Sequence, residues 1–186
     1  MVLANYYFCG KLSASGFVSR LNFLPPSRPF PWREWIPALI WLGIIAVEST
    51  NLMSSAQTGR VLYSLATSIF GRLDPVVFGF IHAALRKVGH VLGYGILSFL
   101  LFRAWRATLR LPDATSWALR WSAVSFCMSL IVASVDELHQ SYLPSRTGAL
   151  HDVILDGAAA LAVQFLLFAL LWNREARARQ HPARLV

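Results

Sequence analysis

The sequence predicts an all-α membrane protein, a bundle of four transmembrane helices with an amphipathic helical connection between the first and second spans. The 186 residues are 56% hydrophobic and only 14% charged, and the mean hydropathy is +0.51. A soluble domain of this length carries about 25% charged residues. Apolar runs near the length of about 20 residues that crosses the hydrocarbon core recur along the chain. Length and composition therefore favour one integral membrane domain.

Residues 1–34 precede the first apolar run and are irregular and basic. Prolines are concentrated between residues 25 and 31, so the end of this segment is predicted to be extended and not helical. It also lacks the compact apolar core and small-residue cleavage site of a signal peptide. We expect a flexible, proline-rich cytoplasmic tail.

The predicted transmembrane domain covers residues 35–173. Its first span begins among tryptophans, which prefer membrane interfaces, and it carries one acid, Glu48, near its end. An arginine-rich cytoplasmic tail, residues 174–186, follows the last span. The four predicted spans are residues 35–53, 86–102, 116–135 and 152–172.

The long connection between the first two spans, residues 54–85, repeats apolar residues at helical intervals. Within it, Asp74 and Pro75 predict a helix start, because the acid can cap the helix and proline suits its first position. We expect one or two amphipathic helices here, lying on the membrane surface or over the bundle. Further on, Gly89 and Gly93 form a small-residue pair that favours close approach of another helix, as does the run of residues 156–160.

Basic residues predict the topology. The 17 lysines and arginines give a formal charge of +8, and 12 of them lie in the N-terminal tail, the loop of residues 103–120 and the C-terminal tail, four in each. Because positive residues favour the cytoplasmic side, both termini are expected in the cytoplasm and the other two connections on the extracytoplasmic side. Basic residues beside apolar runs indicate contact with anionic lipid, so we expect no nucleic-acid partner.

This topology brings the polar residues of four helix ends to one extracytoplasmic face. Charged groups at membrane depth are costly, and they mark functional sites or compensating ion pairs. Asp136, His139 and Gln140 share one helical face by spacing, as do Lys87, His90 and Tyr94. The candidate pocket residues are Lys87, His90, Tyr94, Asp136, Glu137, His139, Gln140, Arg146, Asp152 and Asp156.

Each of these residues has a structural and a functional interpretation. Arg146 paired with Asp152 or Asp156 would tie a loop to the bundle. In the same way, His90 would be a satisfied core histidine. In the functional interpretation, His90 or His139 acts as general acid or base, with a neighbouring carboxylate that sets its tautomer. The sequence has neither a nucleophile elbow nor a phosphate-binding glycine loop.

We expect neither a metal nor another cofactor. The alternative ligand set is His90, His139, Asp136 and Asp152, but the chain has no HExxH motif. Its two cysteines, at positions 9 and 127, are far apart and form neither a metal-ligand spacing nor a disulfide framework.

Four blocks of sequence resemble the VanZ-like family over residues 35–173: Arg86-Lys87-x-x-His90-x-x-x-Tyr94, Asp136-Glu137-x-His139-Gln140, Pro144-x-Arg146-x-Gly148 and Asp152-Val153-x-x-Asp156. The resemblance implies a small multi-pass protein of the bacterial cytoplasmic membrane and carries over the ten candidate residues by motif. Asp156 stands where many relatives have asparagine. The family is named for a protein that gives low-level resistance to the glycopeptide teicoplanin, and the resemblance implies no settled reaction.

Three functions follow as hypotheses. The first is binding of a glycopeptide, lipid or cell-wall precursor at the outer face, linked to envelope protection and antibiotic resistance. The second is a membrane-embedded hydrolase or transferase, since histidine, carboxylate, tyrosine and arginine side chains could supply a base and an oxyanion stabiliser. The third is a structural protein whose charges lock the bundle and whose function lies in a partner. Membrane lipid is an expected partner in each case, and the oligomeric state is left open.

Overall fold

The computed structural model describes residues 29–109, 117–143 and 148–180, with side chains described up to residue 172. The chain divides into Met1–Phe30 and Pro31–Val186, and the fold below is that of the second unit. Its elements are α2 (Trp32–Glu48), η1 (Asn51–Met53), α3 (Ser55–Phe70), α4 (Pro75–Thr108), α5 (Leu119–Ser141) and α6 (Leu150–Gln180). No strand occurs in these ranges, so the all-α prediction is confirmed. The predicted N-terminal tail lies almost wholly outside the described residues.

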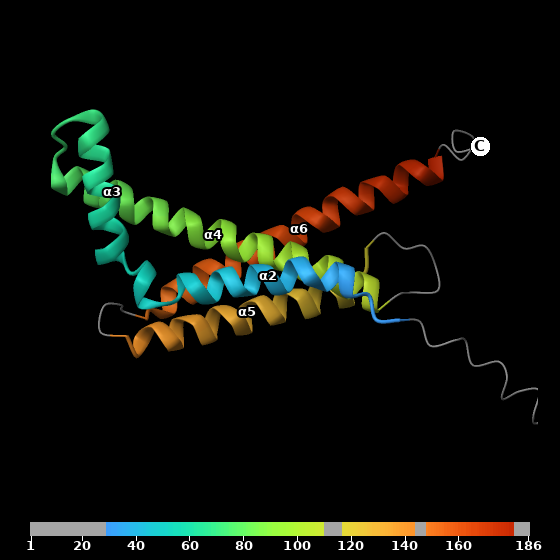
Figure 1. The fold of residues 1–186 in the computed structure, drawn as a ribbon. Helices are drawn as coiled ribbons and strands as arrows, with labels where there is room; N and C mark the ends of the chain where they lie inside the picture. Colours follow the sequence, from blue (N-terminus) through green and yellow to red (C-terminus); the bar gives the residue numbers. More distant parts are fainter. Residues whose placement is uncertain (1–28, 110–116, 144–147, 181–186) are drawn as a thin grey trace, which may run out of the picture. The chain divides into compact units, whose positions relative to one another are not determined.

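α4 is the central helix of the bundle. It packs against α2, α5 and α6, and α5 also packs along α6 (Figure 1). α3 contacts η1 and the N-terminal part of α4, where Tyr63 meets Phe78 edge to face and Thr58 lies 3.2 Å from the Nε2 atom of His82. The bundle core combines Leu97 and Leu101 of α4 with residues of α2 and α5.

Within the described part of the chain, three helices are long and apolar enough to cross a membrane: Pro75–Thr108, Leu119–Ser141 and Leu150–Trp172. With the composition, they establish a membrane protein. The predicted first span, residues 35–53, corresponds to α2, which ends earlier, at Glu48, and has only 17 residues. The polar residues 48–51 explain the early end, since the Thr50 hydroxyl donates to the Val47 carbonyl (2.7 Å) and the chain turns into η1.

The connection between the first two spans differs in one respect from the prediction. α3 is a separate helix, but the second half of the connection and the second span form the single 34-residue helix α4. The Asp74 carboxylate caps this helix by accepting from the Val76 and Val77 amides (2.7 and 3.3 Å). No proline follows Pro75 before Thr108, so nothing breaks the helix. α6 likewise continues beyond the predicted end at residue 172, to Gln180.

Close helix packing occurs at one of the expected sites, the run of residues 156–160, but not at the GxxxG pair of α4. A Cβ atom added at Gly89 or Gly93 would meet nothing within 4 Å. In contrast, a Cβ at Gly95 would lie 3.3 Å from Val163, and one at Gly157 would lie 3.1 Å from Leu130. The small-residue run at the start of α6 thus serves the expected purpose, whereas no described side chain fills the space beside the Cα atoms of the GxxxG pair of α4.

The end of the bundle away from the polar residues is rich in tryptophan. Trp35 of α2 donates to the Thr108 hydroxyl (2.9 Å) and meets Trp105 edge to face. Arg103 pairs with Glu34 at 2.7 Å. These contacts fix the start of α2 beside the end of α4.

Candidate functional site

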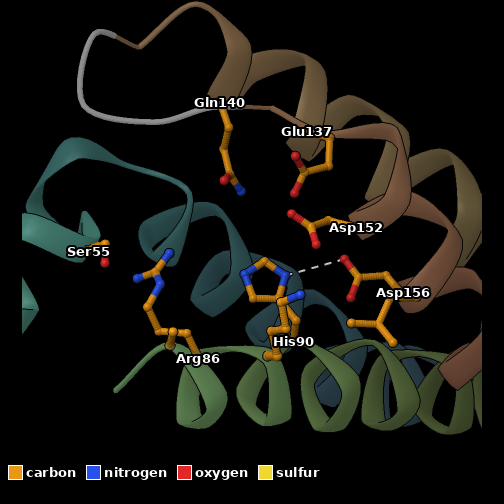
Figure 2. A pocket seen from close by; sticks show the side chains of 10 residues that line it. Ser55, Arg86, His90, Glu137, Gln140, Asp152 and Asp156 are labelled. Atoms are coloured by element: carbon orange, nitrogen blue, oxygen red, sulfur yellow. Dashed lines mark hydrogen bonds and ion pairs between the residues drawn. The ribbon is translucent and has the colours of Figure 1, made fainter. Parts of the chain in front are cut away.

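A polar pocket of about 240 Å³ lies where α3, α4, α5 and α6 meet (Figure 2). It includes six of the ten residues predicted from the sequence: Lys87, His90, Glu137, Gln140, Asp152 and Asp156. The remaining lining residues are Ser55, Ala83, Arg86 and Leu155.

Helical spacing explains why these side chains converge. α4 supplies Ala83, Arg86, Lys87 and His90, which recur every three or four residues and so share one face. α5 supplies Glu137 and Gln140, which are three residues apart. α6 supplies three residues that share one helical face by the same spacing: Asp152, Leu155 and Asp156. Each of these three helices therefore presents one polar stripe to a common space.

His90 and Asp156 form the closest pair in the pocket. The His90 Nδ1 atom lies 3.3 Å from Asp156 Oδ2, and the side chains are 28% and 0% exposed. The other carboxylate oxygen of Asp156, Oδ1, is buried and has no hydrogen-bond partner among the described residues. A half-exposed imidazole thus contacts a carboxylate that is sealed from solvent.

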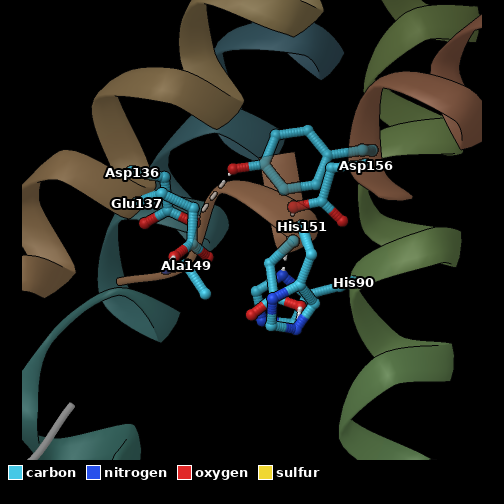
Figure 3. A network of polar contacts seen from close by, with 8 residues as sticks. His90, Asp136, Glu137, Ala149, His151 and Asp156 are labelled. Carbon is cyan, nitrogen blue, oxygen red and sulfur yellow. Dashed lines mark hydrogen bonds and ion pairs between the residues drawn. The ribbon is translucent and has the colours of Figure 1, made fainter. Parts of the chain in front are cut away.

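A second pair, of α4 and α5, belongs to the same network of polar contacts (Figure 3). The Tyr94 hydroxyl donates to Asp136 Oδ2 at 2.9 Å, and both residues are buried. The Tyr94 ring stacks at 6.4 Å from the His90 ring, so the two pairs are in contact. Asp136 Oδ1 is also buried and lacks a partner in the described ranges.

Glu137 joins α5 to the start of α6. Its Oε2 atom accepts a hydrogen bond from the Ala149 amide at 2.9 Å, just before α6 begins at Leu150. A carboxylate at a helix N-terminus satisfies free amides and interacts favourably with the helix dipole. Gly148 is packed so tightly that an added Cβ would clash with the Glu137 carbonyl oxygen and lie 2.8 Å from the Ser141 Cβ atom.

The predicted residues do not all share one pocket. His139 faces α2, where its Nδ1 atom lies 3.0 Å from the Ser49 hydroxyl. Together with Asp136 it lines a separate, mainly apolar pocket of about 570 Å³ between α2 and α5. Asp152 contacts the exposed His151 at 3.0 Å, and Arg146 lies outside the described residues.

Two polar lining residues were missed as candidates. Arg86 lines the pocket and donates to the Met53 carbonyl at 3.0 Å, which also ties α4 to η1. It stands in the matched motif beside Lys87, and a four-residue spacing from His90 would have identified it. Ser55 comes from the start of α3, and the sequence offers no signal that brings it here.

The alternative metal-ligand set is not assembled, because His139 faces the apolar pocket. The described groups whose ligand atoms do converge are His90, Glu137 and Asp156, which lie within 4.8 Å of one another. Chemically, the pocket combines two cations, three carboxylates, an amide and an imidazole.

The comparisons with known proteins identify the family. The model of the VanZ/LLP1 family matches residues 34–172, which include all the described residues of both pockets. Neither the curated proteins nor the solved structures gave a match. The family resemblance of the sequence is therefore confirmed over residues 34–172, and the chain belongs to the VanZ/LLP1 family.

Proposed function

We propose that this protein is a four-span protein of the bacterial cytoplasmic membrane that binds the anionic headgroup of a lipid or lipid-linked cell-wall precursor at its outer face. The observation that carries this proposal is the polar pocket at one end of apolar helices, with Arg86 and Lys87 beside hydrogen-bonding acceptors. Arginine and lysine are the usual binders of phosphate groups in proteins.

The proposal takes α2 as the fourth span. α2 is bound to the bundle along its length, from Trp35 beside Thr108, through Trp41, which donates to the Gly93 carbonyl at 2.8 Å, to Ser49 beside His139. At 1.5 Å per residue its 17 residues measure about 25 Å, slightly less than the hydrocarbon core of about 30 Å. Arg33 and Glu48 are exposed at its two ends, and between them its exposed large side chains are apolar, as a lipid-facing surface requires: Ile36, Leu39, Ile40, Ile44 and Val47.

The distribution of lysine and arginine supports the orientation. The residues up to Arg33, the segment of residues 103–120 that covers the end of α4 and the start of α5, and the residues from 174 onward each carry four of the 17 basic residues. With both termini in the cytoplasm, the pocket opens on the outer side. Glu34→Cys and Ser141→Cys, each in a variant without Cys9 and Cys127, test this orientation. In intact cells, a membrane-impermeant thiol reagent should label only the Ser141→Cys variant.

The size of the pocket favours a headgroup as the ligand. Pockets that hold drug-sized molecules measure about 300–1,000 Å³, and this one measures about 240 Å³. A phosphate would lie near the two cations, while Glu137, Asp152 and Gln140 would accept hydrogen bonds from hydroxyl or amine groups. A whole glycopeptide exceeds this space, so any effect on glycopeptide susceptibility is expected to act through the precursor.

The test is binding of defined lipids to purified protein in nanodiscs. Arg86→Gln and Lys87→Gln should each weaken binding of an anionic precursor lipid about 10- to 100-fold, since a hydrogen bond to a charged group contributes about 1.5–3 kcal/mol. Arg103→Gln is the matched control, because Arg103 pairs with Glu34 at the opposite end. Equal binding by all three variants, or equal binding of phosphatidylcholine and the precursor, contradicts the proposal.

A second candidate function, hydrolysis or group transfer, is favoured by the His90–Asp156 contact. A buried carboxylate that holds a half-exposed imidazole is the arrangement of a general base and its orienting group. If the protein is an enzyme, His90→Gln should abolish turnover of a lipid-linked substrate while binding persists. No turnover by the unaltered protein, with or without divalent metal, would leave binding as the function.

A further inference from the structure

We infer that His90, Glu137 and Asp156 form a binding site for a divalent transition metal, with Zn²⁺ as the preferred ion. One nitrogen and two carboxylate oxygens, from three different helices, lie within 4.8 Å of one another in the floor of the pocket. The site lies in the pocket assigned to the headgroup and in that sense rests on the proposed function, but metal binding is measured on its own.

The spacing of the ligand atoms suits a metal better than a hydrogen bond. Zinc bonds to histidine nitrogen and carboxylate oxygen measure about 2.0–2.2 Å, so two ligands of a tetrahedral ion lie about 3.4 Å apart. The His90 Nδ1 and Asp156 Oδ2 atoms are 3.3 Å apart, which is long for a charge-assisted hydrogen bond of about 2.7–2.9 Å. The Glu137 oxygen lies within 4.8 Å of the other two ligand atoms and has to approach them to reach the spacing of a tetrahedral site.

Asp156 gives an independent indication that the pocket binds a cation. Its side chain is 0% exposed and faces the pocket, yet its Oδ1 atom has no hydrogen-bond partner in the part of the chain that the structure describes. Arg86 and Lys87 line the same pocket, but no described lysine or arginine forms an ion pair with Glu137 or Asp156. The partner of Asp156 is the His90 imidazole, which carries a charge only when it is protonated. A buried carboxylate without a charged partner is costly, and a metal ion bound to it would remove that cost.

The chemistry of the ligands favours zinc. Imidazole and carboxylate together suit Zn²⁺ or Mn²⁺, and zinc binds more tightly at a given site. Calcium prefers six to eight oxygen ligands, which this site does not provide. Three protein ligands leave one position open on a tetrahedral ion, as in catalytic zinc sites.

A bound metal would also reverse the charge of the pocket. With His90 neutral, the three carboxylates and two cations lining it have a formal charge of −1. A divalent ion changes this to +1, which attracts a phosphate group. Binding of an anionic headgroup should therefore depend on the metal.

The experiment measures the metal content of tag-free protein, purified without lipid addition and dialysed against micromolar Zn²⁺. The unaltered chain should retain one zinc per molecule, and its cobalt-substituted form should show the visible absorption of a low-coordinate Co²⁺ site. His90→Ala, Glu137→Gln and Asp156→Asn should each weaken zinc binding at least 10-fold. His151→Gln and Glu34→Gln are the matched histidine and carboxylate controls, and both should retain zinc.

The outcomes separate the two proposals. Less than stoichiometric zinc on the unaltered chain, or full retention by all three ligand variants, overturns the metal site. Because the cobalt spectrum is recorded on the unaltered protein, a variant that fails to fold does not obscure the result. Stoichiometric zinc without binding of the precursor lipid supports the metal site and refutes headgroup binding. Lipid binding that survives a chelator on metal-free protein supports headgroup binding and refutes its dependence on the metal.

Discussion

The contact between Tyr94 and Asp136 gives the sharpest stability prediction, which is the effect of Tyr94→Phe. The substitution removes a hydroxyl that donates to Asp136 Oδ2 at 2.9 Å and leaves the shape of the ring unchanged. Asp136 is 8% exposed, and its other oxygen already lacks a partner in the described chain. A hydrogen bond to a charged group contributes about 1.5–3 kcal/mol, and a buried group left without a partner costs a similar amount. We expect the free energy of unfolding to fall by about 2–3 kcal/mol.

Tyr63→Phe is the matched control. The Tyr63 hydroxyl donates to the Leu73 carbonyl at the same distance, 2.9 Å, but the acceptor is neutral and the contact is only partly buried. Its loss should cost about 1 kcal/mol. Both variants are compared by reversible unfolding in mixed micelles, where a denaturing detergent replaces a mild one. The double variant Tyr94→Phe with Asp136→Ala then gives the coupling energy of the pair.

Two results would refute the reasoning. If Tyr94→Phe costs no more than Tyr63→Phe, the charged acceptor adds nothing. A coupling energy near zero would mean that Tyr94 acts through ring packing and not through Asp136. A coupling of about 1.5 kcal/mol or more is expected.

Two further predictions concern packing. Gly148→Ala should lower the free energy of unfolding by about 1–3 kcal/mol, the usual cost of overpacking, because the added Cβ clashes with the Glu137 carbonyl oxygen. Gly93→Ala is the control and should be neutral or stabilising, because a Cβ at this position meets nothing within 4 Å. Equal effects of the two substitutions in the same unfolding assay would contradict this prediction. Gln164 donates to the Ser98 hydroxyl and carbonyl at 2.7 and 3.1 Å, so Ser98→Ala alone should destabilise, while Ser98→Ala with Gln164→Leu should recover most of the loss because both polar partners are removed. Additive losses in that double variant would exclude a direct interaction.

Local signals in the sequence predicted the helix starts better than the ends. Asp74 and Pro75 identified the start of α4, because capping and proline geometry depend on adjacent residues. The end of α2 was predicted five residues too late, since an apolar run continues to Met53 while the polar residues around Ser49 turn the chain. The prediction separated α4 into an amphipathic helix and a spanning helix because these two stretches differ in composition. Both stretches have the same helical geometry, so they form one continuous helix.

The division of α5 between two pockets could not be predicted. Asp136 and His139 form one pair three residues apart, and Glu137 and Gln140 form the next, rotated by about 100°. Both pairs are polar, so the sequence grouped them together. Which pair lines the pocket beside α2 and which lines the pocket beside α4 and α6 depends on how the helices pack. That information is distributed over apolar residues such as Leu97 and Ala133.

The length of α4 has a consequence for how a ligand arrives. Its 34 residues measure about 51 Å at 1.5 Å per residue, against a hydrocarbon core of about 30 Å. Even a tilt of 40°, the upper end of the usual range, accommodates only about 39 Å, so roughly eight residues must project beyond the core. If the end of α4 that follows α3 projects, the projecting residues include Val76, Val77 and Phe80. Their exposed apolar side chains are suited to the membrane interface and not to open water. We therefore expect the α3–α4 corner to lie in the outer interface beside the pocket, so that a ligand enters sideways from the leaflet.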